Sequence, residues 1–120
     1  MENPTVIHGF SLITEQDTYL FKEGNHFRLH EKLGSHIVDV DGVTGTFFAV
    51  WAPNAKKVSV IGDFNSWDRT AHPLAIRGDG SGIWEGFIPG IGHGAIYKYH
   101  IASRENGYSA NKGDPYARHW

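Results

Sequence analysis

Residues 58–68 read Val58-Ser59-Val60-Ile61-Gly62-Asp63-Phe64-Asn65-Ser66-Trp67-Asp68, an alternating strand that runs into a polar turn. The alternation over Val58–Ile61 has the period of two that is typical of a β-strand. The Gly, Asp, Asn and Ser residues that follow favour a tight turn, because glycine tolerates positive φ and short polar side chains bond to nearby backbone. Trp67 is therefore expected in a turn, where a ring is hard to bury from both sides.

Two interpretations of Trp67 remain open from this local pattern. A flat, exposed indole face suits the C–H face of a sugar ring, and exposed aromatic side chains are enriched at binding sites. Alternatively, the ring folds back as a lid on the sheet. The stretch by itself favours neither interpretation.

Further strands are expected at regular spacing after residue 42. Residues 46–52 are apolar on both faces, so this strand is expected in the centre of a sheet, and Trp51 and Trp84 are expected in the core. Within 95–102, Lys98 should point away from the face that carries Tyr97 and Tyr99. The pattern predicts an all-β chain, an immunoglobulin-like antiparallel β-sandwich. The expected strands cover residues 46–52, 57–62, 83–88, 95–102 and 108–110.

A short helix is expected in the N-terminal segment. Asn25 has the character of an N-cap, Leu29 and Leu33 lie four residues apart on one face, and Gly34 is placed to end the helix. Such a helix is marginal alone and must dock through its apolar side chains or through the apolar cluster at residues 19–21.

Composition excludes several classes of function. The chain has 120 residues, a net charge of -2 and no cysteine, which indicates one domain without disulfides or Cys-based chemistry. Without a basic patch, nucleic acid and acidic membrane surfaces are poor partners. No apolar run is long enough to span a bilayer and no signal peptide is recognisable, so a cytoplasmic location is expected.

The residues give no support for catalysis or for a cofactor. The carboxylates lie in turn or sheet-surface contexts that do not indicate an acid pair for glycoside chemistry. His26 and His30 share one helix face if that segment is helical, but no third ligand is evident, so no metal site is predicted. We expect no catalytic residue and no cofactor in this chain.

Several motifs together resemble the N-terminal glycogen-binding-type module of 1,4-α-glucan branching enzymes. They extend over most of the chain, and the upstream ones distinguish branching enzymes from debranching relatives. The wider module family includes non-catalytic β subunits of AMP-activated protein kinase. The matching stretches are 19–24, 32–36, 42–46, 50–55, 58–60, 62–68, 82–85, 88–89, 97–99 and 114–117.

The resemblance implies specific contacts with α-1,4-glucan such as glycogen or maltooligosaccharide. Trp67 matches the family's stacking Trp and Lys98 its hydroxyl-contacting Lys, whereas Tyr108 falls where glycogen-binding relatives have a second Trp. Asn65 of the same turn is the fourth expected contact. Branching enzymes transfer α-1,4 chains to 6-hydroxyls with carboxylates of a (β/α)8 barrel, which this chain does not contain.

The resemblance also implies a division of the chain and a place in a larger enzyme. An N-terminal extension with one short helix is expected at 1–42, the carbohydrate-binding module at 43–117, and the start of a link to the catalytic barrel at 118–120. The expected function is an accessory module that binds or positions α-glucan. Two alternatives stay open: a structural module that packs on the barrel without binding sugar, and a non-catalytic regulatory subunit that targets glycogen.

Overall fold

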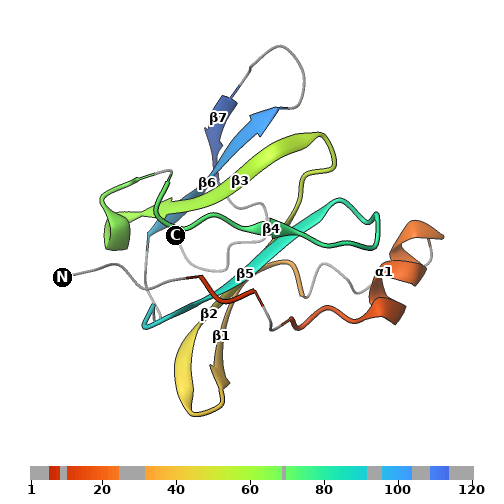
Figure 1. Cartoon of the computed structure of the whole chain (residues 1–120), viewed down its shortest axis with the longest axis horizontal. Helices are drawn as coiled ribbons and strands as arrows, with labels where there is room; N and C mark the ends of the chain where they lie inside the picture. The colour runs from red at the N-terminus through yellow and green to blue at the C-terminus, as the bar shows by residue number, and fades with distance from the viewer. Residues whose placement is uncertain are drawn as a thin grey trace.

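Two antiparallel β-sheets packed face to face form the body of the chain (Figure 1). The computed structural model describes residues 6–8, 11–24, 32–68, 70–91, 96–103 and 109–113. The first sheet has the strand order β1-β2-β5-β4 and the second the order β3-β6-β7. This architecture confirms the predicted antiparallel β-sandwich of immunoglobulin-like type. The elements are α1 (Glu15–Lys22), β1 (Gly34–Val40), β2 (Val43–Trp51), β3 (Ala55–Gly62), the 3-10 helix η2 (Asp63–Asn65), β4 (Ala75–Ile76), β5 (Ile83–Pro89), β6 (Tyr97–Ser103) and β7 (Ser109–Lys112).

The main core lies between the two sheets. Strand β2 is paired with β1 on one side and β5 on the other, which confirms its predicted central position. Trp84 is 7% exposed and donates from Nε1 to the Ala52 carbonyl at 3.0 Å, so its predicted core placement is also confirmed. The largest contributors to this core include Phe48, Val50, Trp84 and Ile88 of the first sheet and Val58, Val60 and Tyr99 of the second.

The prediction of a buried Trp51 is wrong. Its side chain is 53% exposed, and its Nε1 donates to the Ser81 carbonyl at 3.1 Å. Trp51 is the last residue of β2 and alternates with Val50, so its ring points away from the main core. An apolar run shows that a strand is covered on both faces, but it does not show where along the strand the cover stops.

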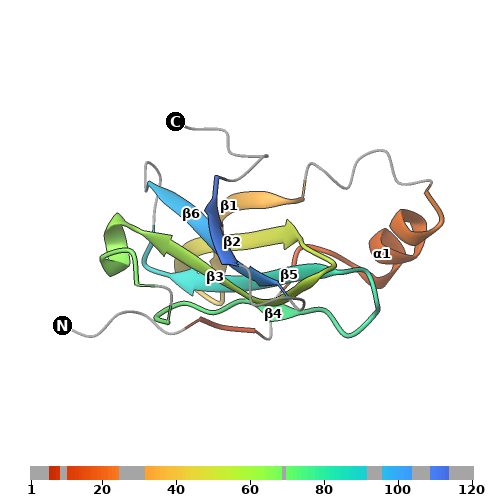
Figure 2. The same ribbon diagram turned by 90° about the horizontal axis from the view of Figure 1, so that it is seen from above.

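A second apolar cluster covers the outer face of the first sheet. Phe47, Ala49 and Phe87 meet Ile13 and Leu33 there. Both faces of β2 are therefore apolar because one faces the second sheet and the other faces the N-terminal segment. Figure 2 shows this segment and α1 beside the two layers of strands.

The described helix lies earlier in the chain than the predicted one. Thr14 and Asp17 cap α1 reciprocally: Asp17 N donates to Thr14 Oγ1 at 3.1 Å, and Thr14 N donates to Asp17 Oδ2 at 2.8 Å. The predicted N-cap Asn25 and the helix residues up to 31 lie outside the described residues. Its predicted end at Gly34 is wrong, because residues 32–33 form a turn and a bend and Gly34 opens β1 opposite Ala49.

Strand β1 belongs to the sandwich although it lies before residue 43. It forms a hairpin with β2 in which Val40 pairs with Val43, so residues 41–42 are the hairpin turn. The division at 1–42, 43–117 and 118–120 stays a prediction. The first sheet itself begins at Gly34, and a boundary at 42 would cut a hydrogen-bonded hairpin.

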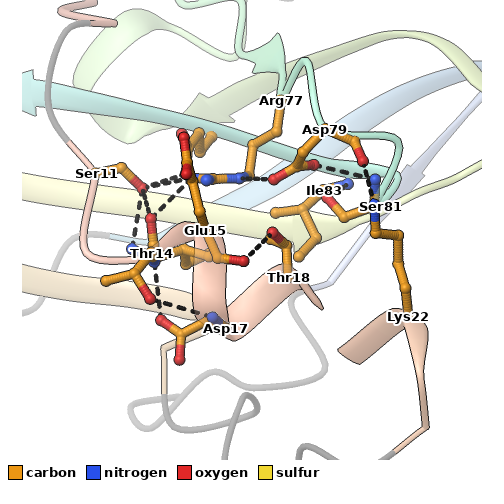
Figure 3. A network of polar contacts seen from close by, with 12 residues as sticks. Ser11, Thr14, Glu15, Asp17, Thr18, Lys22, Arg77, Asp79, Ser81 and Ile83 are labelled. Atoms are coloured by element: carbon orange, nitrogen blue, oxygen red, sulfur yellow. Dashed lines mark hydrogen bonds and ion pairs between the residues drawn. The ribbon is translucent and has the colours of Figure 1, made fainter. Parts of the chain in front are cut away.

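A polar network fastens the N-terminal segment to the β4–β5 edge (Figure 3). Arg77 donates from Nη1 to Ser11 Oγ at 2.9 Å and to Glu85 Oε1 at 3.1 Å, and from Nε to Asp79 Oδ2 at 2.9 Å. Burial alone would lower the pKa of Arg77, but hydrogen bonds to Asp79 and the charge of Glu85 outweigh it and raise that pKa. Burial alone would raise the pKa of Asp79, but hydrogen bonds from Arg77 and Ser81 hold it well below its usual value.

One segment connects the two sheets along an edge. Val60 N donates to the His72 carbonyl at 2.9 Å and Leu74 N to the Val58 carbonyl at 2.8 Å, so residues 72–74 lie along the outer edge of β3. The next two residues form β4 and pair with β5 in the other sheet. This crossing places His72 directly beneath the turn that follows β3.

Candidate functional site

The turn after β3 presents Trp67 on the surface. Ser66 and Trp67 have φ of 57° and 61°, two consecutive non-glycine residues in the left-handed region. Trp67 N donates to the Gly62 carbonyl at 2.9 Å, and Asp68 N donates to the Asn65 carbonyl at 3.1 Å. The Trp67 side chain is 44% exposed, which favours the surface interpretation over a ring buried as a lid. Positive φ at a bulky residue is uncommon and is found mostly where the surrounding structure enforces it, often at functional sites.

Asn65 supports this turn from the inside, and its predicted role in binding sugar stays a prediction. The residue is only 3% exposed. Its Oδ1 accepts from Gly62 N at 3.0 Å, and its Nδ2 donates to the Val60 carbonyl at 3.0 Å and lies 2.7 Å from His72 Nδ1. With these bonds the amide holds the two ends of the turn together below the surface. The sequence reveals the turn chemistry of Asn65 but not its partner His72, which comes from a segment seven residues later.

Gly62 lets the turn lie tight against the start of β6. Its φ of -173° is ordinary extended backbone, so the requirement for glycine is steric. A Cβ at this position would lie 2.5 Å from the Ile96 carbonyl oxygen and 2.6 Å from the Phe64 ring. Asp63 N also donates to that Ile96 carbonyl at 3.2 Å. The turn is thus fixed relative to β6 as well as to β3.

Lys98 lies on the outer face of the second sheet, as predicted. It is exposed and alternates with Tyr97 and Tyr99, and Tyr99 is fully buried in the main core. Lys98 pairs with Ile61 in the sheet register, one residue before Gly62. The turn that carries Trp67 and the ammonium-bearing side chain are therefore at the same end of the sheet.

Tyr108, the third predicted contact, lies outside the described residues. The next residue, Ser109, pairs with Ala102 of β6. Ala102 is four residues along β6 from Lys98, roughly 13 Å at about 3.3 Å per residue.

The described residues contain little that indicates other chemistry. Among them, no group of three or more His, Asp or Glu side chains could hold a metal ion. His26 and His30 lie outside these residues. Glu85 binds Arg77 and Ser11, and Asp68 Oδ1 accepts from both the backbone and the hydroxyl of Thr70. No helix in this part of the chain is long and apolar enough to cross a membrane.

Comparison with known proteins identifies both a family and a set of larger relatives. Residues 32–117 match the family model of carbohydrate-binding module 48, the isoamylase N-terminal domain. The chain is 58% identical over 104 residues to the 1,4-alpha-glucan branching enzyme GlgB of Thermosynechococcus vestitus, covering 87% of this chain and 13% of that protein. It is 54% identical over 108 residues to GlgB of Aquifex aeolicus, covering 90% of this chain and 17% of that protein. The chain thus spans only a small part of the length of these relatives.

Proposed function

Because the chain belongs to the carbohydrate-binding module 48 family, we propose that it binds α-1,4-glucan as the accessory module of a 1,4-α-glucan branching enzyme. The observation that carries this proposal is the exposed ring of Trp67 in a turn fixed from below. The Asn65 amide and the close contact of Gly62 with Ile96 hold the backbone before any ligand arrives. A preorganised aromatic surface loses little conformational entropy on binding.

The proposed ligand lies across the outer face of the second sheet. Trp67 stacks on one sugar ring, and the Lys98 ammonium donates to hydroxyls nearby. Tyr108 is proposed as the second ring that contacts the glucan. A neutral, hydroxyl-rich polymer suits a chain of net charge -2, whereas a polyanion does not.

The larger protein is proposed to act as a glycosyltransferase in glycogen biosynthesis. In this proposal a catalytic barrel elsewhere in the polypeptide transfers α-1,4 chains to 6-hydroxyls, and the present module delivers or positions the glucan. The support is the similarity to branching enzymes that are about six to eight times longer than the matched stretch. A cytoplasmic location is proposed together with this function, and the absence of cysteine is compatible with a reducing compartment.

A second candidate function is structural packing against the catalytic barrel, and Trp51 favours it. Its ring is exposed at the end of β2, on a different part of the molecule from Trp67. A groove of about 330 Å³ begins beside it and includes Pro53, Tyr99, Ile101 and Ala110 among its lining residues. Exposed apolar surface of this kind often marks a protein contact. The two candidate functions use different surfaces, so each predicts loss of function on substitution of different residues.

The test is affinity electrophoresis of the chain in gels with and without glycogen. We expect glycogen to retard the wild-type chain and Trp67→Ala to lose most of this retardation, since a stacked ring contributes about 1 kcal/mol or more. Trp51→Ala is the matched control, because it removes another exposed indole from a different surface and should be retarded like wild type.

The two variants also separate the alternatives. A wild-type chain that migrates equally in both gels would exclude glucan binding by the module and leave the structural function. Retardation that depends on Trp51 instead of Trp67 would show that sugar binds at the Trp51 surface and would contradict the proposed site. A natural gene that encodes no barrel would point to a regulatory, glycogen-targeting subunit.

A further inference from the structure

His100 and Asn111 form a polar pair on the outer face of the second sheet. They are cross-strand partners in the β6–β7 register, and His100 Nδ1 lies 2.7 Å from Asn111 Oδ1. Asn111 is exposed and His100 half-buried. His100 is two residues from Lys98 on the same face of β6, about 7 Å away.

The hydrogen bond between the two side chains fixes what each presents to solvent. The Asn111 carbonyl oxygen can only accept, so His100 Nδ1 carries the proton and donates. When Nδ1 is the protonated ring nitrogen, Nε2 can accept a hydrogen bond, and the Asn111 amide nitrogen carries two N–H groups that can donate. Among the described residues, neither Nε2 of His100 nor the amide nitrogen of Asn111 has a hydrogen-bond partner. A donor and an acceptor thus lie side by side on an exposed face.

The pair lies in line with the proposed stacking residue. Gly62, where the Trp67 turn begins, is opposite Tyr97, Lys98 follows, and His100 is the next residue on that face. Figure 1 shows the green turn after β3 at the end of the sheet where β6 starts, with β7 farther along β6. A chain that stacks on Trp67 and runs along β6 would pass Lys98 and then this pair.

We propose that His100 and Asn111 bind the adjacent 2- and 3-hydroxyls of an inner glucose unit, an inference that rests on the proposed function. In an α-1,4-linked chain the 1- and 4-positions are used in the linkages, so the 2- and 3-hydroxyls are the free neighbouring pair. One of them donates to His100 Nε2 while the other accepts from the Asn111 amide. The pair therefore recognises the interior of a glucan and requires no chain end.

The test uses β-cyclodextrin, a ring of α-1,4-linked glucose without chain ends, and measures Kd and Tm for each variant. We expect Asn111→Ala and Asn111→Thr each to raise Kd about fivefold, the effect of losing one hydrogen bond, with Tm close to that of wild type. Threonine has a high β-strand propensity, so Asn111→Thr replaces Asn111→Ala in the test if the alanine variant folds poorly. Asn54→Ala removes an exposed asparagine at the opposite end of β3 and should leave Kd unchanged.

A second arm changes the ligand. β-Cyclodextrin whose 2- and 3-hydroxyls are methylated should bind wild type more weakly than the unmodified ring, and Asn111→Ala should discriminate less between the two. Wild-type Kd in both Asn111 variants, with binding lost in Trp67→Ala, would overturn this inference and leave the proposed function intact. No binding of β-cyclodextrin or glycogen by the wild-type chain would overturn both.

Discussion

The orientation of Trp67 depends on the Asn65 side chain, which is almost fully buried. Asn65 satisfies Gly62 N and the Val60 carbonyl inside the turn and meets His72 from the edge segment. Each of these groups is shielded from water, and a buried polar group that loses its partner is costly. At the scale of single residues, therefore, binding geometry and stability of the turn have the same origin.

Replacing Asn65 with alanine should destabilise the fold and weaken glucan binding together. The change leaves several buried polar groups without their amide partner, so we expect a loss of roughly 2–4 kcal/mol in the free energy of unfolding. Urea denaturation measures this loss, and Asn54→Ala should stay within about 0.5 kcal/mol of wild type. An unchanged urea midpoint in Asn65→Ala would contradict the role assigned to the amide.

At the scale of elements, Arg77 joins the distant segment before α1 to the β4–β5 edge of the first sheet. It bonds to Ser11 before α1, to Asp79 after β4 and to Glu85 in β5. Lys32 adds an ion pair of 2.6 Å with Asp17 in α1. The N-terminal segment is thus held to the sheet by charge as well as by the apolar contacts of Ile13.

This network predicts a specific loss of stability in acid. The pKa of Asp79 is lower in the folded chain than its unfolded value near 4, so its contribution is complete above that value and is lost as the pH falls below it. Asp79→Asn should remove this contribution, about 1 kcal/mol for a partly exposed ion pair. The measurement is Tm between pH 7 and pH 2: the variant should be less stable than wild type at pH 7 and approach it in acid. Glu23→Gln, at an exposed carboxylate, is the control and should follow the wild-type curve.

Strands with a long alternating pattern of apolar and polar residues could be predicted from the sequence, whereas short elements could not. The alternation in β3 and β6 predicts both strands and the outward direction of Lys98. The two-residue strand β4 has no detectable period, and it exists because β5 offers an unpaired edge. The sequence Thr14-x-x-Asp17 is a capping signal for α1. The i, i+4 pair Leu29 and Leu33 favoured a later helix instead, but Leu33 packs in the apolar cluster on the outer face of the first sheet.

At the scale of the whole molecule, the sandwich and the turn that carries Trp67 could be predicted, but the exposure of its ring and the internal support of the site could not. Periodicity and turn chemistry are local, whereas Asn65 depends on His72 and the polar pair at His100 depends on the register of β7. The exposure of Trp51 depends on how far the N-terminal cover extends. Such properties are fixed by contacts between segments, which a single sequence does not display.

The position of strand β6 predicts how ligand binding changes the rate of amide hydrogen exchange. Its backbone amides are bonded between β3 and β7, Tyr99 is locked in the core, and Lys98 and His100 reach toward the proposed ligand. A ligand that binds only the native chain, at ten times its Kd, should slow the exchange of the most protected β6 amides about tenfold. Amide hydrogen exchange with and without β-cyclodextrin measures this, and unchanged β6 rates at saturation would contradict it. Because one face of β6 packs in the core and the other carries the residues proposed to bind glucan, tighter binding and slower opening of the sandwich are expected to change together.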